Sequence, residues 1–492
     1  MPLKAYPQNV RCYGVFLGLL LLSLSLFSCQ NQPAGTRKDV AYGDTLVIGT
    51  NHPSPLLNPL LSASGISSVL VELVFSGLTE VNARLEIQPG LASGWTASPD
   101  GRRWTFRLRR GTRFHDGREL TAEDVAFTLG LANRYRVRNP YADVFRSIEA
   151  MRAKDRYTVE IDLSRSTYDL LYALNLGILP RHLLAGQDLS HSPFNYRPVG
   201  TGPFRVSSWL KQEVVLEAHQ DYFRGRPYLD RVVVQSYSSQ RAAWAHLLRG
   251  EIDFFFGFDP QSYRVIRDNR NFRAYSYLLP YYYLLALNLE NGLFKEVRVR
   301  RALNYAIDRQ KLIRQALQGR GGVASGPLYP ASGDADPQIS PYPYDPHQAQ
   351  ALLKEAGWED RDGDGLLDLE GRQFAFSLSI NQGDEINQRV ALLLQQQLLE
   401  IGVRVVIQPL SNLALDQEIL GRRYQALLVE AAAREAPSHN YNFFHSSRIE
   451  GGLNFTSYRN PRVDALLEDA RASLDLARRR QLYRQFQREL WA

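Results

Sequence analysis

Residues 277–307 read YLLPYYYLLALNLENGLFKEVRVRRALNYAI and separate two parts of the chain that differ in character. The first half is aromatic and apolar from Tyr281 to Leu289, which predicts a strand buried on at least one side. From Glu296 onward apolar residues recur at helical spacing, with arginines largely on the opposite face, which predicts an amphipathic helix. We interpret the stretch as the crossover between two lobes. The alternative is a strand and a helix inside one domain.

Length and composition support more than one lobe. The chain has 492 residues, too many for one ordinary core, and 44% of them are hydrophobic, which is typical of globular proteins. The formal net charge is +7, and removing residues 1–28, whose charged residues are Lys4 and Arg11, leaves +5. Basic residues are scattered along the chain, which argues against a nucleic-acid partner.

The N-terminus has the pattern of an export signal. Residues 15–27 form an apolar run of signal-peptide length, too short to span a bilayer comfortably. The end of this run and the two residues after it, Leu26, Phe27, Ser28 and Cys29, resemble a bacterial lipobox, in which the signal is cut before a lipid-carrying cysteine. We predict a signal peptide over 1–28, lipidation of Cys29, a tether over 29–43 and an extracytoplasmic, membrane-anchored protein. The alternative is an ordinary signal peptide followed by a chance cysteine.

Strands and helices alternate on both sides of the crossover. Before it, a strand at 231–237, a helix at 241–248 and a strand at 252–256 predict a βαβ unit. After it, strands at 374–380, 403–409 and 424–430 surround a helix at 385–400, which predicts a second parallel sheet with its own helices. Near residue 121, a threonine in the N-cap position and Asp124 three residues later predict the start of another helix. The predicted fold class is therefore mixed α/β.

Five stretches carry a family resemblance, in order and spacing. They are GLTEVNARLEIQPGLASGWTASPDGRRWTFRLRRGTRFHDG from 77, FHDGRELTAEDVAFTL from 114, VGTGPFRV from 199, GEIDFFFG from 250 and VRVRRALNYAIDRQKL from 297. The chain resembles the family 5 solute-binding proteins, which deliver peptides, nickel and related solutes to ABC transporters. The resemblance implies a two-lobed periplasmic-binding-protein-like clam-shell with an extra subdomain in the first lobe. The expected boundaries are lobe I over 44–280, with the subdomain at about 65–195, and lobe II over 281–492, with a missing C-terminal return to lobe I.

The resemblance also suggests where a ligand binds. Peptide-binding members hold the ligand between the lobes through backbone hydrogen bonds. Dipeptide-binding members also clamp the free termini with an Arg and an Asp. By alignment the Arg position falls at Asn381, and the Asp is missing within residues 429–437, so longer peptides or another solute are expected. The candidate ligand-binding residues are Asn51, Tyr281, Tyr283, Asn381, Glu430, Arg434 and Tyr441.

The sequence gives no positive sign of a metal site or of catalysis. Asp360, Asp362 and Asp364 resemble the start of a calcium loop, but Gly371 stands where a bidentate Glu belongs, which favours a polar turn. His439 and His445 flank a strand's loop and are predicted to be surface histidines. Nucleophile elbows, P-loops and zinc-binding spacings are absent from the sequence. We therefore predict no cofactor and no enzyme activity.

The leading hypothesis is a monomeric, lipid-anchored receptor that captures oligopeptides or a related solute and passes them to ABC-transporter permease subunits. A second hypothesis is a cell-surface hydrolase that uses carboxylates or the tyrosine-rich stretch. A third is a sensory lipoprotein that keeps the scaffold without transport.

Overall fold

The fold is described from a computed structural model, which describes residues 41–51, 56–61, 66–134, 141–255, 263, 266–433 and 436–492. The predicted signal peptide, Cys29 and most of the predicted tether lie outside the described residues. Every element below belongs to one unit, residues 42–492. Two main sheets with separate cores confirm the predicted mixed α/β, two-lobed fold.

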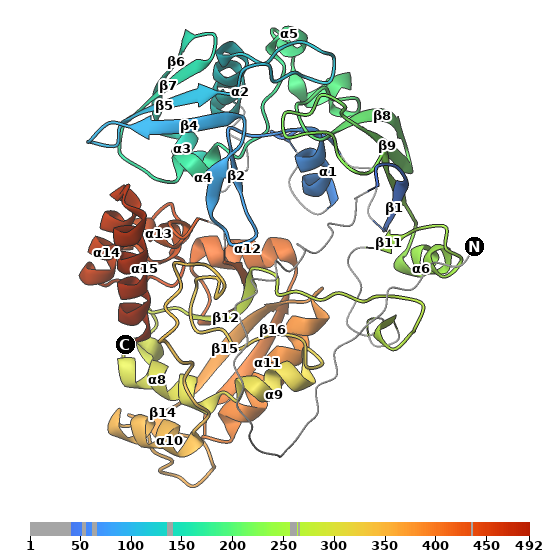
Figure 1. Ribbon diagram of the computed structural model, residues 1–492. Coiled ribbons are helices and arrows are strands. Elements are labelled where there is room, and N and C mark those ends of the chain that lie inside the picture. Colours follow the sequence, from blue (N-terminus) through green and yellow to red (C-terminus); the bar gives the residue numbers. More distant parts are fainter. Residues whose placement is uncertain are drawn as a thin grey trace, which may run out of the picture. The chain divides into compact units, whose positions relative to one another are not determined.

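The first sheet contains the predicted βαβ unit. The strand order is β11 (Phe254–Phe255), β1 (Thr45–Thr50), β10 (Arg231–Ser236), β9 (Glu213–Ala218) and β8 (Phe204–Leu210). β1 is parallel to both β10 and β11, and α6 (Gln240–Leu248) connects those two strands. β1 therefore lies between the two strands of the βαβ unit. Figure 1 shows β1, β11 and α6 in the same part of the molecule.

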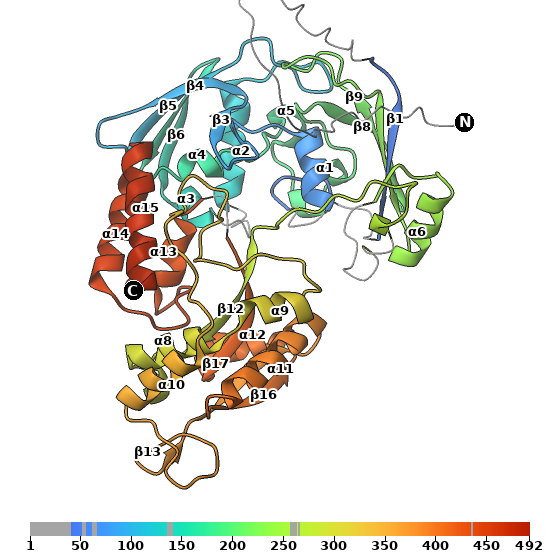
Figure 2. The same cartoon turned by 60° about the horizontal axis from the view of Figure 1, so that its bottom comes forward.

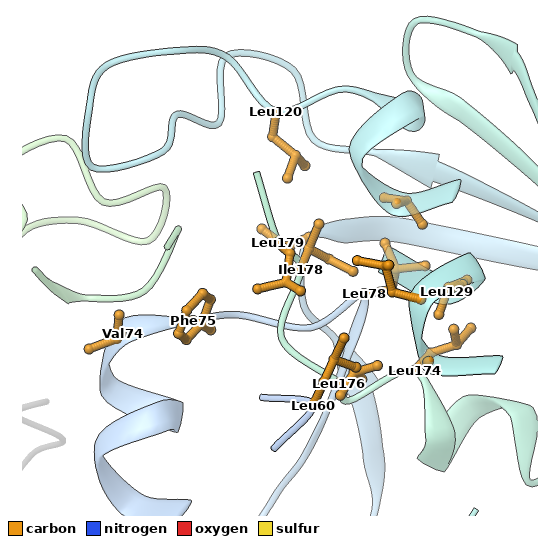
Figure 3. Packing of buried hydrophobic residues seen from close by; sticks show 14 of the residues in the cluster. Leu60, Val74, Phe75, Leu78, Leu120, Leu129, Leu174, Leu176, Ile178 and Leu179 are labelled. Atoms are coloured by element: carbon orange, nitrogen blue, oxygen red, sulfur yellow. The ribbon is translucent and has the colours of Figure 1, made fainter. Parts of the chain in front are cut away.

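A second layer of the first core comes from an antiparallel sheet within residues 92–163. Its order is β4 (Ala92–Ala97), β5 (Arg103–Leu108), β7 (Thr158–Leu163) and β6 (Ile148–Asp155). α2 (Ala122–Arg134) packs on this sheet through its buried residues Val125 and Leu129. Figure 3 shows Leu129 among residues from several other segments, including Leu78 and Ile178. Both sheets thus contribute to one hydrophobic core.

At the start of α2, the side chain of Asp124 caps the helix and also bonds a neighbouring segment. Asp124 accepts hydrogen bonds from the Thr121 amide (2.9 Å) and hydroxyl (3.0 Å) through one oxygen. Its other oxygen accepts from the amide of Arg181, 3.0 Å away, at the start of α5 (Arg181–Leu184). Asp124, which the sequence predicts at the start of this helix, therefore also connects α2 to α5.

The remaining short elements of this part are α1 (Ile66–Val74), β2 (Thr79–Val81), β3 (Ile87–Pro89), α3 (Ala142–Arg146), α4 (Leu170–Ala173), η1 (Leu189–His191) and η2 (Pro193–Asn195). They include a two-stranded antiparallel sheet, β2 with β3.

The second main sheet has the order β12 (Tyr281–Leu287), β17 (Ala426–Ala432), β15 (Ala375–Asn381) and β16 (Arg404–Leu410). β15 is parallel to β16 and β17, as predicted, whereas the crossover strand β12 is antiparallel to β17. The helices and turns that accompany this sheet are η3 (Gly292–Phe294), α8 (Val297–Ala306), α9 (Arg309–Gln315), α10 (Pro346–Glu355), α11 (Glu385–Leu399) and α12 (Asn412–Gly421), with the hairpin β13 (Asp368–Leu369) and β14 (Arg372–Gln373).

The C-terminal helices form a small core of their own. α13 (His439–Phe444), η4 (Ser446–Arg448), α14 (Pro461–Ala472) and α15 (Leu476–Trp491) gather around Tyr483 and Phe486. They also contact the loop after β7, where the Ser166 hydroxyl donates to the carbonyl of Ala472 at 3.1 Å. Figure 2 shows α14 and α15 beside β4, β5 and β6. Among the described residues, no helix is long and apolar enough to cross a membrane.

Candidate functional site

Four of the predicted ligand-binding residues lie at one edge of the second main sheet. β15 ends at Asn381, and its parallel neighbour β17 ends at Ala432. β12 runs the other way and begins at Tyr281, so its start lies at the same edge. Tyr283 of β12 is directly opposite Glu430 of β17. Tyr281, Tyr283, Asn381 and Glu430 are therefore gathered by strand topology, as parallel strand ends require.

This edge is acidic and partly apolar. Burial, with the carboxylates of Glu430 and Asp384 nearby, raises the pKa of the Tyr283 phenol to about 12. Burial, and then the charge of Asp384, raises the pKa of the Glu430 carboxyl. Tyr281 is 54% exposed and presents a free aromatic surface. The edge can therefore accept hydrogen bonds from amide or ammonium groups and cover an apolar side chain.

Asn381 is held within its own loop. Its amide nitrogen donates to the side-chain oxygen of Asn412 at 2.6 Å, and its own side-chain oxygen accepts from the amide of Gly383 at 2.9 Å. A neutral, engaged amide cannot replace a guanidinium as the partner of a carboxylate.

The other predicted residues lie elsewhere. Asn51 is exposed and follows the end of β1 in the first sheet. Arg434 lies outside the described residues. Tyr441 lies on α13, where the guanidinium groups of Arg471 and Arg448 lie 4.8 and 5.1 Å from its ring centre. The sequence reasoning selected Tyr441 and missed both arginines.

The prediction of a surface position is wrong for His445. That residue is 6% exposed, its Nε2 lies 3.1 Å from a carboxylate oxygen of Glu468, and its Nδ1 lies 2.8 Å from the Ser447 hydroxyl. His439 is half-buried and packs edge-on against Phe443. The His445 ring stacks on Tyr441 of α13, 4.2 Å between ring centres, and contacts Glu468 of α14, so tertiary packing buries a residue whose local sequence is polar.

The aspartate loop brings Asp360, Asp362, Asp364 and Asp368 together, with one oxygen from each within 4.8 Å of the others. Asp360 accepts from the amides of Gly363 and Gly365 at 2.8 and 3.1 Å. These bonds form a turn of the predicted kind.

A polar groove of about 630 Å³ lies in the first sheet's region, and it is lined in part by His115 and His219. Both rings contact the carbonyl oxygen of Gly202, at 3.1 and 3.2 Å. The amide of Gly200 donates to His115 Nδ1 at 3.1 Å, so the other ring nitrogen carries the proton. Burial lowers the pKa of His115 to about 4. One wall of the groove is therefore formed where His115, from the stretch that begins at 114, is hydrogen-bonded to the stretch that begins at 199.

The family that matches this chain and two of its relatives, AppA and GsiB, are all solute-binding proteins. Residues 86–451 match the family described as bacterial extracellular solute-binding proteins, family 5 middle. The oligopeptide-binding protein AppA of Bacillus subtilis is 32% identical over 473 residues, which are 94% of this chain and 86% of AppA. A glutathione-binding protein, GsiB of Pectobacterium atrosepticum, is 28% identical over 91% of this chain and 86% of its own.

Solved structures of relatives have the same fold. AppA of Bacillus subtilis in complex with a nonapeptide superposes with a TM-score of 0.68, covering 92% of this chain and 91% of AppA at 32% identity. NikZ of Campylobacter jejuni in complex with Ni(L-His) gives a TM-score of 0.72, with 91% and 90% covered at 28% identity.

Proposed function

Because the chain belongs to the bacterial extracellular solute-binding proteins of family 5, we propose that it captures oligopeptides and delivers them to the permease subunits of an ABC transporter. The observation that carries the proposal is the similarity to AppA, which extends over 94% of this chain and includes the fold of the nonapeptide complex. The ligand is enclosed between lobes at 44–280 and 281–492. The two separate hydrophobic cores, one on each side of the crossover, support this division.

The proposed ligand is longer than a dipeptide. A dipeptide has two charged termini close together, and burying either without a counter-charge is costly. At the two clamp positions this chain has Asn381, whose amide is engaged by Asn412, and a run of alanines in which Ala433 is 6% exposed. Tyr281, Tyr283, Asn381, Glu430 and Tyr441, with Asn51 and Arg434, are the proposed contacts.

Residues 1–28 are proposed to be a signal peptide, and Cys29 the lipidated residue that anchors the protein to a bacterial membrane through the tether 29–43. The apolar run at 15–27 and the lipobox-like Leu26–Cys29 at its end support this assignment. Metabolic labelling with a radioactive fatty acid tests it: the full chain takes up label, and Cys29→Ser does not. Label retained by Cys29→Ser contradicts it.

Calorimetry with alanine-based peptides of two, four and nine residues tests capture and length together. We expect 1:1 binding that strengthens from the dipeptide to the longer peptides. A folded protein that binds none of them contradicts peptide capture. Mass spectrometry of the same peptides after incubation separates capture from hydrolysis, because a receptor returns them intact. Peptide uptake that requires the partner permease separates transport from a sensory role.

A further inference from the structure

Two arginines, Arg448 and Arg471, lie beside the ring of Tyr441, and Arg165 is close enough to feel the charge of both. We call Arg165, Arg448 and Arg471 the arginine cluster. Arg471 comes from the end of α14, and its guanidinium lies 4.8 Å from the ring centre. Arg448 ends η4 and lies 5.1 Å from the same centre. Arg165 follows β7, and its loop is joined to the end of α14 by the Tyr168 amide, which donates to the carbonyl of Arg471 at 3.4 Å. The cluster therefore joins a segment before the crossover to two segments after it.

The cluster is partly desolvated, and within the described part of the chain its carboxylate neighbour is Asp169, which acts on Arg165 at a distance without forming an ion pair with it. Arg471 is 9% exposed, and the Nε atoms of Arg471 and Arg448 are buried without a hydrogen-bond partner. Among the residues that the structure describes, no carboxylate forms an ion pair with any of the three. Burial, and then the charges of Arg471 and Arg448, lowers the pKa of Arg165. By contrast Arg462, on the same helix as Arg471, pairs with Glu489 at 2.8 Å.

The two aspartates that line a cavity with Arg471 pair with other arginines: Asp143 with Arg146, and Asp169 with Arg479. Asp169 is 4% exposed and lies 3.5 Å from the guanidinium of Arg479, which is itself fully buried. Asp169 and Arg471 both line a small cavity of about 20 Å³, enough for one water molecule. The three like charges repel one another, and burying the Arg471 guanidinium without a paired anion costs free energy.

We propose that the arginine cluster is a subsite for a carboxylate of the captured ligand. The proposal rests on the proposed function and names its ligand class: peptides with a carboxylate at the C-terminus or on an acidic side chain. Guanidinium groups bind carboxylates through paired, charge-assisted hydrogen bonds. A carboxylate here would replace repulsion between Arg165 and the two later arginines with attraction to all three, so ligand binding would draw these segments together.

Three matched nonapeptides locate the carboxylate. The first has one Glu and a free C-terminus, the second has the same Glu and an amidated C-terminus, and the third has Gln and an amidated C-terminus. Calorimetry with the full chain should show at least tenfold weaker binding when the recognised carboxylate is removed, since hydrogen bonds to a charged group are stronger than those between neutral groups. Arg471→Gln and Arg165→Gln should abolish this discrimination. Arg462→Gln, which removes a paired arginine from the same helix, should preserve it.

Two further measurements separate this proposal from peptide capture and from a structural role. Citrate should raise the thermal unfolding temperature of the ligand-free protein and of Arg462→Gln, but not that of Arg165→Gln or Arg471→Gln. Arg165→Gln should also unfold at the same or a higher temperature without ligand, because it relieves repulsion.

Equal affinity for all three peptides, or a wild-type protein unaffected by citrate, overturns the carboxylate subsite while peptide capture stands. Binding of citrate without binding of any peptide overturns peptide capture while the anion site stands. A lower unfolding temperature of Arg165→Gln shows that the arginine serves the fold and overturns the proposal.

Discussion

The stability of the protein should fall as the pH drops below about 6.5, because of His115. The Gly200 amide donates to Nδ1 of this ring, and the other ring nitrogen contacts the Gly202 carbonyl. Protonating Nδ1 breaks the first bond and places a charge in a buried site. Burial therefore lowers the pKa of His115 from 6.5 to about 4 in the folded chain.

The size of the effect follows from the two pKa values. Above pH 6.5 the ring is neutral in both states, and the contribution to stability is fully present. Between pH 6.5 and 4 the unfolded chain takes up a proton that the folded chain refuses, so the free energy of unfolding falls by about 1.4 kcal/mol per pH unit. The two values lie about 2.5 pH units apart, which gives a total loss of ~3 kcal/mol. His219, whose pKa burial also lowers, adds a loss of the same sign.

Urea unfolding followed by tryptophan fluorescence from pH 8 to pH 4.5 measures this slope. His115→Asn removes the titrating ring and should flatten the pH dependence, whatever its stability at pH 8. His191→Asn is the matched control, since that side chain is 92% exposed and should leave the slope unchanged. If His115→Asn retains the wild-type slope, burial of this ring is not the cause.

Two further predictions concern packing and buried charge. Gly200→Ala should destabilise the protein by ~1–3 kcal/mol, because the added Cβ would lie 2.0 Å from the carbonyl oxygen of Val74. Gly94→Ala in β4 meets open space and should be nearly neutral. Thermal unfolding of both variants checks this prediction. Asp169→Asn should lower the free energy of unfolding, measured in urea, by ~3–5 kcal/mol, because it leaves the buried Arg479 without its ion-pair partner. Adding Arg479→Met should recover most of that loss. A double variant as unstable as Asp169→Asn alone would rule out the buried ion pair as the cause.

Local signals in the sequence were sufficient for most elements of the fold. Thr121 and Asp124 marked the start of α2, apolar periodicity located α8, and the Leu- and Gln-rich stretch at 385–400 located α11. The alternation of strands and helices after the crossover gave the parallel strands β15 to β17. The antiparallel direction of β12 was not predicted, because strand direction depends on pairing with β17, which is more than a hundred residues away in sequence.

The sequence allows candidate residues to be grouped in space only where the ends of neighbouring strands bring them together. Tyr283 and Glu430 meet because parallel strand ends and the start of β12 share one edge, which topology implies. The arginine cluster gives no local signal: Arg165 is about three hundred residues from Arg471, and a single arginine near a helix end is an ordinary partner for the helix dipole. His115 and His219 likewise meet only through the chain's tertiary path to Gly202.

Native mass spectrometry of the full chain, purified without denaturant and then mixed with a nonapeptide, shows whether this protein is a receptor for oligopeptides. We expect a 1:1 complex, with the bound peptide recovered intact after release. A folded protein that carries no peptide from its host, and whose mass does not change when the nonapeptide is added, would contradict this function.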